Sequence, residues 1–128
     1  MRLLLDSSVL IDVLRGRRGR PAWLRQLVLD GHSLETSALN VAEVRAGMRP
    51  GEEVRTQGLL GALRCHPVTV KAGEKAGDFR NHWARRGRTL SLADAVVAAV
   101  TVEQGCTLVT DNRRDFPMPE VRLFDLPA

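Results

Sequence analysis

Several carboxylates of the sequence lie where a predicted strand ends or a predicted helix begins. Asp6 follows three consecutive leucines, Glu43 lies on a helix soon after the second predicted strand, and Asp94 lies in the first turn of a strongly apolar helix. Asp111 and Asp115 follow a late strand-like segment. In an open parallel sheet, ligands bind beyond the carboxyl ends of the strands. One edge of the sheet is therefore expected to gather these acids.

Each acid also has an ordinary structural interpretation. Asp6 could cap the first helix, and Asp94, three residues after Ser91, resembles part of a capping box. The two later aspartates could form a turn beside Asn112. Glu43 has no basic partner three or four residues away on its helix, which argues against a surface ion pair. The common location of all the acids favours a shared site over separate structural roles.

A cluster of three or four carboxylates cannot stay ionised without a cation, because like charges within about 4–6 Å raise one another's pKa. All-oxygen ligands suit Mg²⁺ or Mn²⁺, which polarise a phosphoryl oxygen and help to generate hydroxide from water. The histidines His32, His66 and His82 have no zinc-site spacing, and Cys65 and Cys106 form neither a disulfide framework nor a metal quartet. Magnesium or manganese is therefore the expected cofactor.

The elements that must position these acids alternate along the chain. Strands are expected at residues 2–5, 32–36, 67–70, 107–110 and 121–124, and helices at about 8–15, 21–30, 38–48, 52–65, 72–86 and 91–104. Strands that alternate with helices predict an α/β fold, a three-layer α/β/α sandwich with a mostly parallel central sheet. No linker or repeat divides the chain, so residues 1–128 are expected to form one domain.

Composition supports a globular protein with an anionic partner. The 128 residues are 44% hydrophobic and 27% charged, with a formal net charge of +4, and arginine makes up most of the basic residues. A pI near 10.0 indicates a polyanionic partner, although genomic base composition could also account for the arginine. The apolar runs are too short to span a bilayer, and no signal peptide is evident, so a cytoplasmic location is expected.

Four segments of the chain carry a family resemblance. LLLDSSVLIDVLRG at Leu3–Gly16, SALNVAEVRAG at Ser37–Gly47, LSLADAVVAAV at Leu90–Val100 and LVTDNRRDF at Leu108–Phe116 resemble successive blocks of PIN-domain ribonucleases. The similarity is greatest to VapC-type toxins of toxin–antitoxin pairs. The four blocks occur in the family's order and span nearly the whole chain.

The resemblance implies a Mg²⁺- or Mn²⁺-dependent endoribonuclease that hydrolyses RNA phosphodiester bonds. It assigns Asp6, Glu43 and Asp94 as metal-binding acids. At the fourth position, Asn112 stands where some relatives have aspartate, and Asp115 is the nearest remaining acid. We therefore predict Asp6, Glu43, Asp94 and Asp115 as both catalytic and metal-binding residues, and leave open whether one or two metals bind.

Neutral residues of the same blocks are predicted to line the pocket. Ser8 and Thr110 match positions that in the family form hydrogen bonds there, although each could instead serve only as a helix cap. Asn112 could hold a water or a phosphate oxygen as a neutral group. Asp111 falls on a variable position of the family pattern and is weighted below Asp115.

Arginines adjoin two of the four blocks and are candidates to contact RNA phosphates. They are Arg85, Arg86, Arg88, Arg113 and Arg114. The alternative for each cluster is a solvated surface. Aromatic residues make up only 4% of the chain, too few for a platform on which single-stranded bases stack, so contacts to phosphate are expected to dominate.

The resemblance further implies a homodimer and a cognate antitoxin, with no membrane contact and no DNA binding by this chain alone. Two other functions are weighed. A catalytically impaired PIN-like fold could act as a binding module, which the asparagine at position 112 keeps open. A phospho-acceptor signalling domain typically needs a pair of acids near its first strand and a late lysine, and this chain has a single acid there and no lysine after Lys75.

Overall fold

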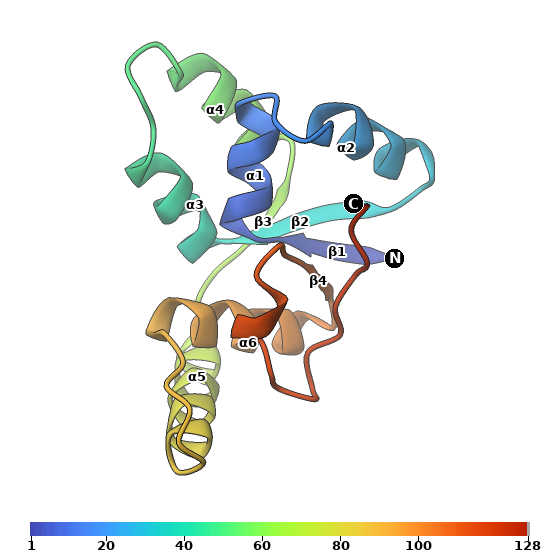
Figure 1. Ribbon diagram of the computed structural model, residues 1–128. Coiled ribbons are helices and arrows are strands. Elements are labelled where there is room, and N and C mark those ends of the chain that lie inside the picture. Colours follow the sequence, from blue (N-terminus) through green and yellow to red (C-terminus); the bar gives the residue numbers. More distant parts are fainter. Residues whose placement is uncertain (128) are drawn as a thin grey trace.

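Short strands form the centre of the molecule in the computed structural model, which describes residues 1–127 (Figure 1). They are β1 (Arg2–Leu5), β2 (Ser33–Ser37), β3 (Arg64–His66) and β4 (Thr107–Val109). The sheet has the order β3-β2-β1-β4, and every neighbouring pair is parallel. All carboxyl ends of the strands therefore lie at one edge of the sheet.

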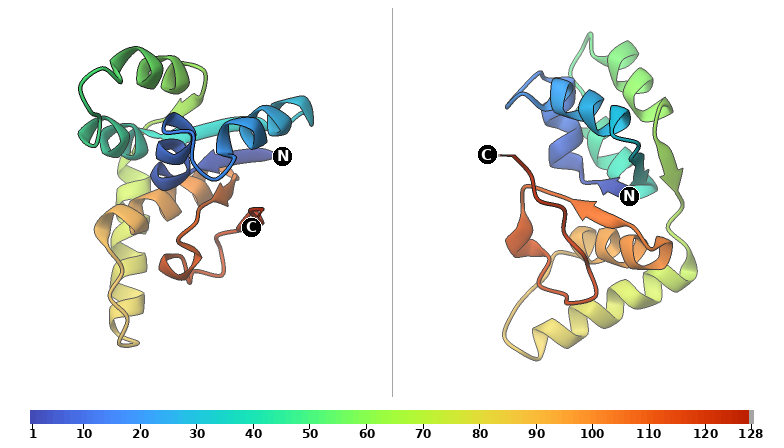
Figure 2. Two further views of the ribbon diagram at one scale, coloured as in Figure 1. Left: turned by 45° about the horizontal axis from the view of Figure 1, so that its top comes forward. Right: turned by 90° about the vertical axis from the view of Figure 1, so that its right-hand side faces the viewer.

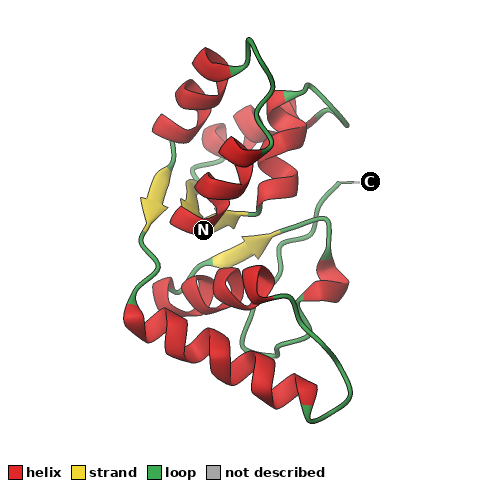
Figure 3. Ribbon diagram, turned by 90° about the vertical axis from the view of Figure 1, so that its left-hand side faces the viewer, coloured by secondary structure: helices red, strands yellow, loops and turns green. Residues whose placement is uncertain are grey.

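Helices cover both faces of this sheet (Figures 2 and 3). One layer contains α1 (Ser7–Leu14), α2 (Arg20–Leu29) and α4 (Glu53–Gly61), and the other contains α5 (Val70–Ala84) and α6 (Leu92–Gln104). The helix α3 (Ala38–Ala46) contacts both α1 and α6. This arrangement confirms the predicted three-layer α/β/α sandwich, with a fully parallel sheet.

The strand β1 connects the two hydrophobic layers. Leu3, Leu4 and Leu5 are completely buried, and successive side chains of a strand point to opposite faces. Leu3 and Leu5 accordingly pack with α1, α2 and α4, whereas Leu4 packs with α5 and α6. A strand buried on both faces reads as a continuous apolar run, which is why this element could be predicted from its sequence.

Polar side chains set the starts of the helices around the site. The hydroxyl of Ser91 accepts the Asp94 N–H at 3.0 Å at the start of α6, as predicted, and Ser37 caps α3. At the first helix, Asp6 is the cap, which is the ordinary structural role that its position in the sequence allowed, and Ser8 is not. Asp6 is extended and its carboxylate accepts the Ser7 N–H at 2.9 Å, so the acid itself caps α1.

The third strand lies earlier than predicted. Residues 67–70 were expected to be extended, but β3 occupies residues 64–66, and α5 already begins at Val70. The prediction was wrong because the Thr69 hydroxyl accepts the Ala72 N–H at 3.0 Å and caps a helix there. The β-branched residues around the cap favour strands in general, but the cap decides the local structure.

The predicted fifth strand at residues 121–124 is reduced to a single bridge between Leu108 and Leu123. In a three-residue strand such as β4, alternate residues direct their backbone groups to opposite sides. Only Leu108 is free to bond away from β1, donating to Arg122 O and accepting from Phe124 N, both at 2.8 Å. The short η1 helix (Arg113–Asp115) precedes this segment. None of the helices within residues 1–127 has both the length and the apolar character needed to cross a lipid bilayer.

A buried ionic network joins strands that are distant in sequence. The Arg2 guanidinium donates to both Glu35 oxygens, at 2.9 and 2.8 Å, and His66 and the Cys106 thiol also contact this carboxylate. Burial opposes ionisation of Glu35, but the hydrogen bonds from Arg2 and His66 outweigh it and lower its pKa to about 2. Glu35 therefore stays ionised inside the protein.

The same network resembles a metal site in composition only. Glu35, His66 and Cys106 each offer a ligand atom, and these atoms lie within 4.8 Å of one another. However, Arg2 already supplies the positive charge, and burial together with the Glu35 charge raises the pKa of the Cys106 thiol to about 11. A protonated thiol beside a guanidinium is a poor metal ligand, so we interpret this group as structural.

The low pKa of Glu35 predicts a specific acid sensitivity of the fold. Because the folded pKa lies below the ordinary value of 4.5, the stabilisation is complete above about pH 4.5 and is lost as the pH falls toward 2. Urea unfolding between pH 6 and 3.5 should show a smaller loss of stability in Glu35→Gln than in the wild type. Glu74→Gln, an exposed acid of α5, serves as the control and should follow the wild type. Equal slopes for wild type and Glu35→Gln would contradict the assignment.

Candidate active site

The carboxyl ends of β1, β2 and β4 bring the predicted acids toward one another. Asp6 follows β1 directly, Glu43 lies on α3 after β2, and Asp94 lies in the first turn of α6. Thr110 follows β4, and Asp115 ends η1. The geometric rule used for the sequence, that parallel strands end at one edge, therefore holds in the structure.

Asp6 is the most buried and most firmly held of these acids, with 6% of its surface exposed. Its Oδ1 accepts hydrogen bonds from the Ser7 N–H at 2.9 Å and the Asn40 amide at 3.2 Å, and its Oδ2 accepts from the Thr110 hydroxyl at 2.7 Å. The backbone N–H of Asp6 donates to Val109 O at 2.9 Å. Neutral donors thus fix the side chain of Asp6, and a backbone carbonyl acceptor fixes its main chain.

Asn40 is oriented by the cap of α3. Its Oδ1 accepts from the hydroxyl of Ser37 at 2.6 Å and from the Ser37 N–H at 3.3 Å, which completes a capping box. The amide Nδ2 is thereby directed to Asp6 and to the Ser7 hydroxyl, the latter at 2.9 Å. A residue that is fully buried and has a structural role in the cap therefore also orients the site.

Glu43 lies one turn after Asn40 on α3, and its Oε1 accepts a hydrogen bond from the Ser7 hydroxyl at 2.7 Å. Ser7 therefore bridges the third helix and the end of β1. Its hydroxyl accepts from the amide and donates to the carboxylate, so the direction of both hydrogen bonds is determined.

The acids interact through their charges. Burial raises the pKa of Asp6, and the charge of Glu43 raises it further, against the hydrogen bonds that lower it. Burial also raises the pKa of Asp94, and the charges of Asp115 and Asp6 add to this effect. The four acids therefore form one electrostatic cluster, although Asp115 itself is exposed on η1.

The cluster is open. Among residues 1–127, no three of these acids bring carboxylate oxygens within 4.8 Å of one another. Magnesium fits such a set, because it is usually bound through one or two protein carboxylates and keeps several of its waters. The donor atoms are all oxygens of acids, which suits a hard divalent cation.

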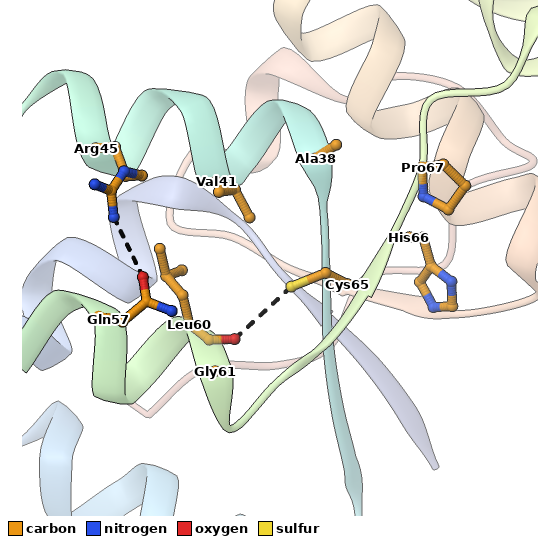
Figure 4. Close-up of a pocket in the computed structure, with 9 residues that line it drawn as sticks. All are labelled: Ala38, Val41, Arg45, Gln57, Leu60, Gly61, Cys65, His66 and Pro67. Atoms are coloured by element: carbon orange, nitrogen blue, oxygen red, sulfur yellow. Dashed lines mark hydrogen bonds between the residues drawn. The ribbon is translucent and has the colours of Figure 1, made fainter.

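A well-formed hollow on the surface lies elsewhere. It has a volume of about 490 Å³ and is lined by residues of α3, α4 and β3, including Val41, Leu60 and Cys65 (Figure 4). None of the predicted acids lines it. The chemistry of the carboxylates, and not the size of a pocket, therefore locates the candidate active site.

The hydrogen-bonding serine of the site differs from the prediction. Ser8 was expected to line the pocket, but Ser7 makes these contacts, and the Ser8 hydroxyl is buried without a hydrogen-bond partner in the described part of the chain. Since α1 begins at residue 7, the first helical residue lies beside the cap and the second is turned away. The Thr110 hydroxyl donates a hydrogen bond to Asp6, and its role in lining the pocket stays a prediction.

Sequence reasoning missed Ser7 and Asn40. The spacing Ser37-x-x-Asn40 at the start of a helix is a signal for the cap, but nothing in it shows that the amide would reach across to Asp6. Asp111, weighted low, accepts from Arg18 and Arg20 and does not join the acidic cluster. Asn112 is exposed, and its backbone N–H donates to the Thr110 hydroxyl at 3.0 Å.

The predicted phosphate-contacting arginines lie on the surface. Arg85, Arg86 and Arg88 are exposed in the connection between α5 and α6, and Arg113 and Arg114 are exposed on η1 beside Asp115. Arg86 contacts His82, and Arg113 contacts Asp125 at 3.5 Å. Their contact with RNA stays a prediction.

Comparisons with known proteins give matches over most of the chain. The PIN domain family model matches residues 3–120. The chain is 36% identical to ribonuclease VapC10 of Mycobacterium tuberculosis over 92% of its length and 88% of the relative's. It superposes on a chain of VapBC2 from Rickettsia felis, bound to a promoter DNA fragment, with a TM-score of 0.83 and 19% identity, covering 99% and 100% of the two chains. FitAcB of Neisseria gonorrhoeae matches with a TM-score of 0.79 and 26% identity, covering 98% and 97%.

Asn40, which is hydrogen-bonded, and Ser8, whose hydroxyl has no partner in the described structure, provide a matched test of the hydrogen-bond network. Asn40→Ala should lower the free energy of unfolding by about 2–4 kcal/mol, because it removes a capping partner and leaves buried groups unpaired. Ser8→Ala should change it by less than about 0.5 kcal/mol, since its hydroxyl makes no hydrogen bond in the described structure. Chemical denaturation measures both. Equal losses in the two variants would refute the network.

Proposed function

Because the chain belongs to the PIN domain family, and is 36% identical to a VapC ribonuclease over most of its length, we propose that it is a metal-dependent endoribonuclease that acts as the toxin of a toxin–antitoxin pair. Its substrate is RNA, and the reaction is hydrolysis of a phosphodiester bond. The site residues are the four clustered acids, and two of them, Asp6 and Glu43, accept hydrogen bonds from neutral donors.

The observation that supports this proposal is a group of acids that no basic side chain of residues 1–127 neutralises. Within residues 1–127, none of Asp6, Glu43, Asp94 and Asp115 makes an ion pair. The pKa values of Asp6 and Asp94 are raised by burial and by neighbouring carboxylates. A cluster of this kind is destabilising by itself, and functional sites are where such arrangements occur.

Magnesium or manganese completes the site in this proposal. Asp6 and Asp94 would hold the cation directly, with Glu43 and Asp115 supporting it from the neighbouring elements. When bound there, such a cation would stabilise charge on the scissile phosphate and would lower the pKa of a neighbouring water. The oxygen-only donor set of the cluster fits either ion.

The protein's own groups orient this chemistry. Thr110 and Asn40 hold the two oxygens of Asp6, so that its carboxylate cannot rotate freely. Ser7 holds one oxygen of Glu43 and leaves the other without a hydrogen bond in the described structure. Rigid placement of acidic oxygens before the substrate arrives reduces the reorganisation that the reaction would otherwise need.

Recognition of RNA is proposed to rest on phosphates. The exposed arginines of η1, Arg113 and Arg114, lie on the segment that carries Asp115. Arg85, Arg86 and Arg88 lie in the connection that leads into α6, the helix that carries Asp94. Guanidinium groups bind phosphate with paired hydrogen bonds and leave the sequence of bases unread. This gives affinity without base specificity.

A cognate antitoxin and a second copy of this chain are the proposed protein partners. The solved relatives with TM-scores of 0.83 and 0.79 are described as VapBC2 and FitAcB, the first bound to a promoter DNA fragment. By analogy, an antitoxin would neutralise this chain and would contribute the contact with DNA. The acidic cluster of this chain would present negative charge to which a basic side chain of such a partner could bind.

The test of the proposed activity is a single neutral substitution. Asp94→Asn keeps the shape of the side chain and removes one charge of the cluster, so cleavage of an RNA mixture with Mg²⁺ or Mn²⁺ should fall by at least about 100-fold. The melting temperature of the metal-free protein should stay the same or rise, because repulsion with Asp6 and Asp115 is relieved.

Asp78→Asn, the same exchange at an exposed acid of α5, is the control and should cleave as the wild type does. EDTA should stop cleavage, and either cation should restore it. Full activity in Asp94→Asn would remove the acid from the site. Absence of cleavage by the wild type in all conditions would favour a binding module with a PIN-like fold.

A further inference from the structure

We propose that Arg20 is a positioning residue that holds the Thr110–Asn112 turn through Asp111 and thereby fixes the Asp6 carboxylate. The catalytic consequence rests on the proposed ribonuclease function. The sequence indicates only that Arg20 belongs to a basic run and that Asp111 is a variable acid near the site. In the structure, the side chains of Arg20 and Asp111 form an ion pair.

The contact is made between elements that are far apart in sequence. Nη2 of Arg20, the first residue of α2, donates to Oδ1 of Asp111 at 2.9 Å, across 91 positions of the chain. The Arg20 guanidinium also lies over the ring of Trp23, with 5.3 Å between its central carbon and the ring centroid. One charged side chain thus links the helical layer to the turn after β4.

The burial of Arg20 is unusual for a residue in a basic surface run. Only 1% of it is exposed, and its Nε is buried without a hydrogen-bond partner in the described part of the chain. Burying a guanidinium is costly unless it is paired, and Asp111 is the acid that pairs it. Arg20 is therefore not available to bind RNA phosphate, and its placement calls for a role inside the protein.

The connection between α1 and α2 is shaped to make this contact. Arg18 has a φ of +55°, a left-handed conformation that is unfavourable for residues with a side chain, and the adjacent Gly19 has a φ of +67°. This sharp turn brings Nη1 of Arg18 to the same Asp111 oxygen, also at 2.9 Å. Two arginines from one strained segment thus converge on a single carboxylate oxygen.

The Thr110–Asn112 turn, which contains Asp111, also holds a residue that contacts the candidate site. The Thr110 hydroxyl accepts the Asn112 N–H at 3.0 Å and donates to Asp6 Oδ2 at 2.7 Å. Asp111 lies between the two residues of the first of these bonds. If Asp111 loses its anchor, the turn relaxes, and the Thr110 hydroxyl is no longer directed at Asp6.

Arg20 and Arg18 both pair with Asp111 but differ in burial, so substituting each in turn distinguishes a buried anchor from an exposed ion pair. The Arg18 side chain is 53% exposed, whereas that of Arg20 is 1% exposed. An ion pair exposed to water is weak, and the buried pair is the one that fixes geometry. Arg18→Gln is therefore the matched control for Arg20→Gln, since both remove one contact to the same oxygen.

The experiment measures steady-state RNA cleavage, with Mg²⁺, in Asp111→Asn, Arg20→Gln, Arg18→Gln and the double variant Arg20→Gln/Asp111→Asn. We expect kcat to fall about tenfold in Asp111→Asn and Arg20→Gln with KM changed less than about twofold, because misplacement of an oriented group affects the chemical step. The double variant should lose no more than either single one. Arg18→Gln should stay within about twofold of the wild type.

A second readout does not depend on cleavage. Hydrogen exchange of the Asn112 amide, measured by NMR, should be faster in Asp111→Asn and Arg20→Gln and unchanged in Arg18→Gln. Asp111→Asn keeps the outcome measurable if Arg20→Gln does not fold, because its carboxylate is partly exposed and the replacement has the same shape.

Variants that unfold at a lower temperature but keep the wild-type kcat and the wild-type Asn112 exchange rate would overturn the proposal. The Arg20–Asp111 pair would then have only a structural role. An unstable Arg20→Gln with a normal Asp111→Asn would do the same. If the wild type cleaves no RNA, the proposed function fails, whereas faster Asn112 exchange in Asp111→Asn would still support the anchoring of the turn.

Discussion

The burial of carboxylates beside one another at one edge of the sheet is the constraint around which the site is built. Asp6 and Asp94 are both harder to ionise than free acids, because burial removes water and neighbouring acids add negative charge. Hydrogen bonds from Thr110, Asn40 and the Ser7 backbone hold Asp6 in this unfavourable place. These donors are neutral, so they fix position without cancelling charge. The remaining charge is available to a cation.

Glu35 is a buried acid outside this cluster, and its environment differs from that of Asp6. It is completely buried, yet Arg2 and His66 contact it, and its pKa is lowered to about 2. Asp6 is also buried, and its pKa moves in the opposite direction. The difference lies in the hydrogen-bond partners. The Arg2 guanidinium donates to Glu35, whereas only neutral groups donate to Asp6. Glu35 stabilises the fold, whereas Asp6 is an acid that we propose binds an external cation.

Much of this arrangement could be predicted from the sequence, because it follows from short-range rules. The run Leu3–Leu5 before Asp6 indicates a strand buried on both faces, and Ser37 and Ser91 indicate the starts of the helices that carry Glu43 and Asp94. The parallel sheet then brings these acids to one edge. Their place in the fold was therefore predictable.

The contacts that orient the acids were not predictable in this way. Whether Ser7 or Ser8 faces the site depends on which residue caps α1, and a shift of one position turns a helical side chain by about 100°. The Asn40 bond to Asp6 and the Arg20 bond to Asp111 join residues 34 and 91 positions apart. Local patterns carry no signal for such pairs. The strand β3 was misplaced for a related reason, because the Thr69 cap outweighs strand propensity.

The most direct test of the account is the thermal unfolding of the protein with increasing Mn²⁺, compared between wild type and Asp94→Asn. Binding to the folded state at about 100 times the dissociation constant stabilises by about 2.7 kcal/mol, which corresponds to a rise in Tm on the order of 10 °C for a domain of this size. The account predicts this rise in the wild type and its loss in Asp94→Asn, whose metal-free Tm is equal or higher. An unchanged Tm in the wild type, or the same rise in both proteins, would contradict it.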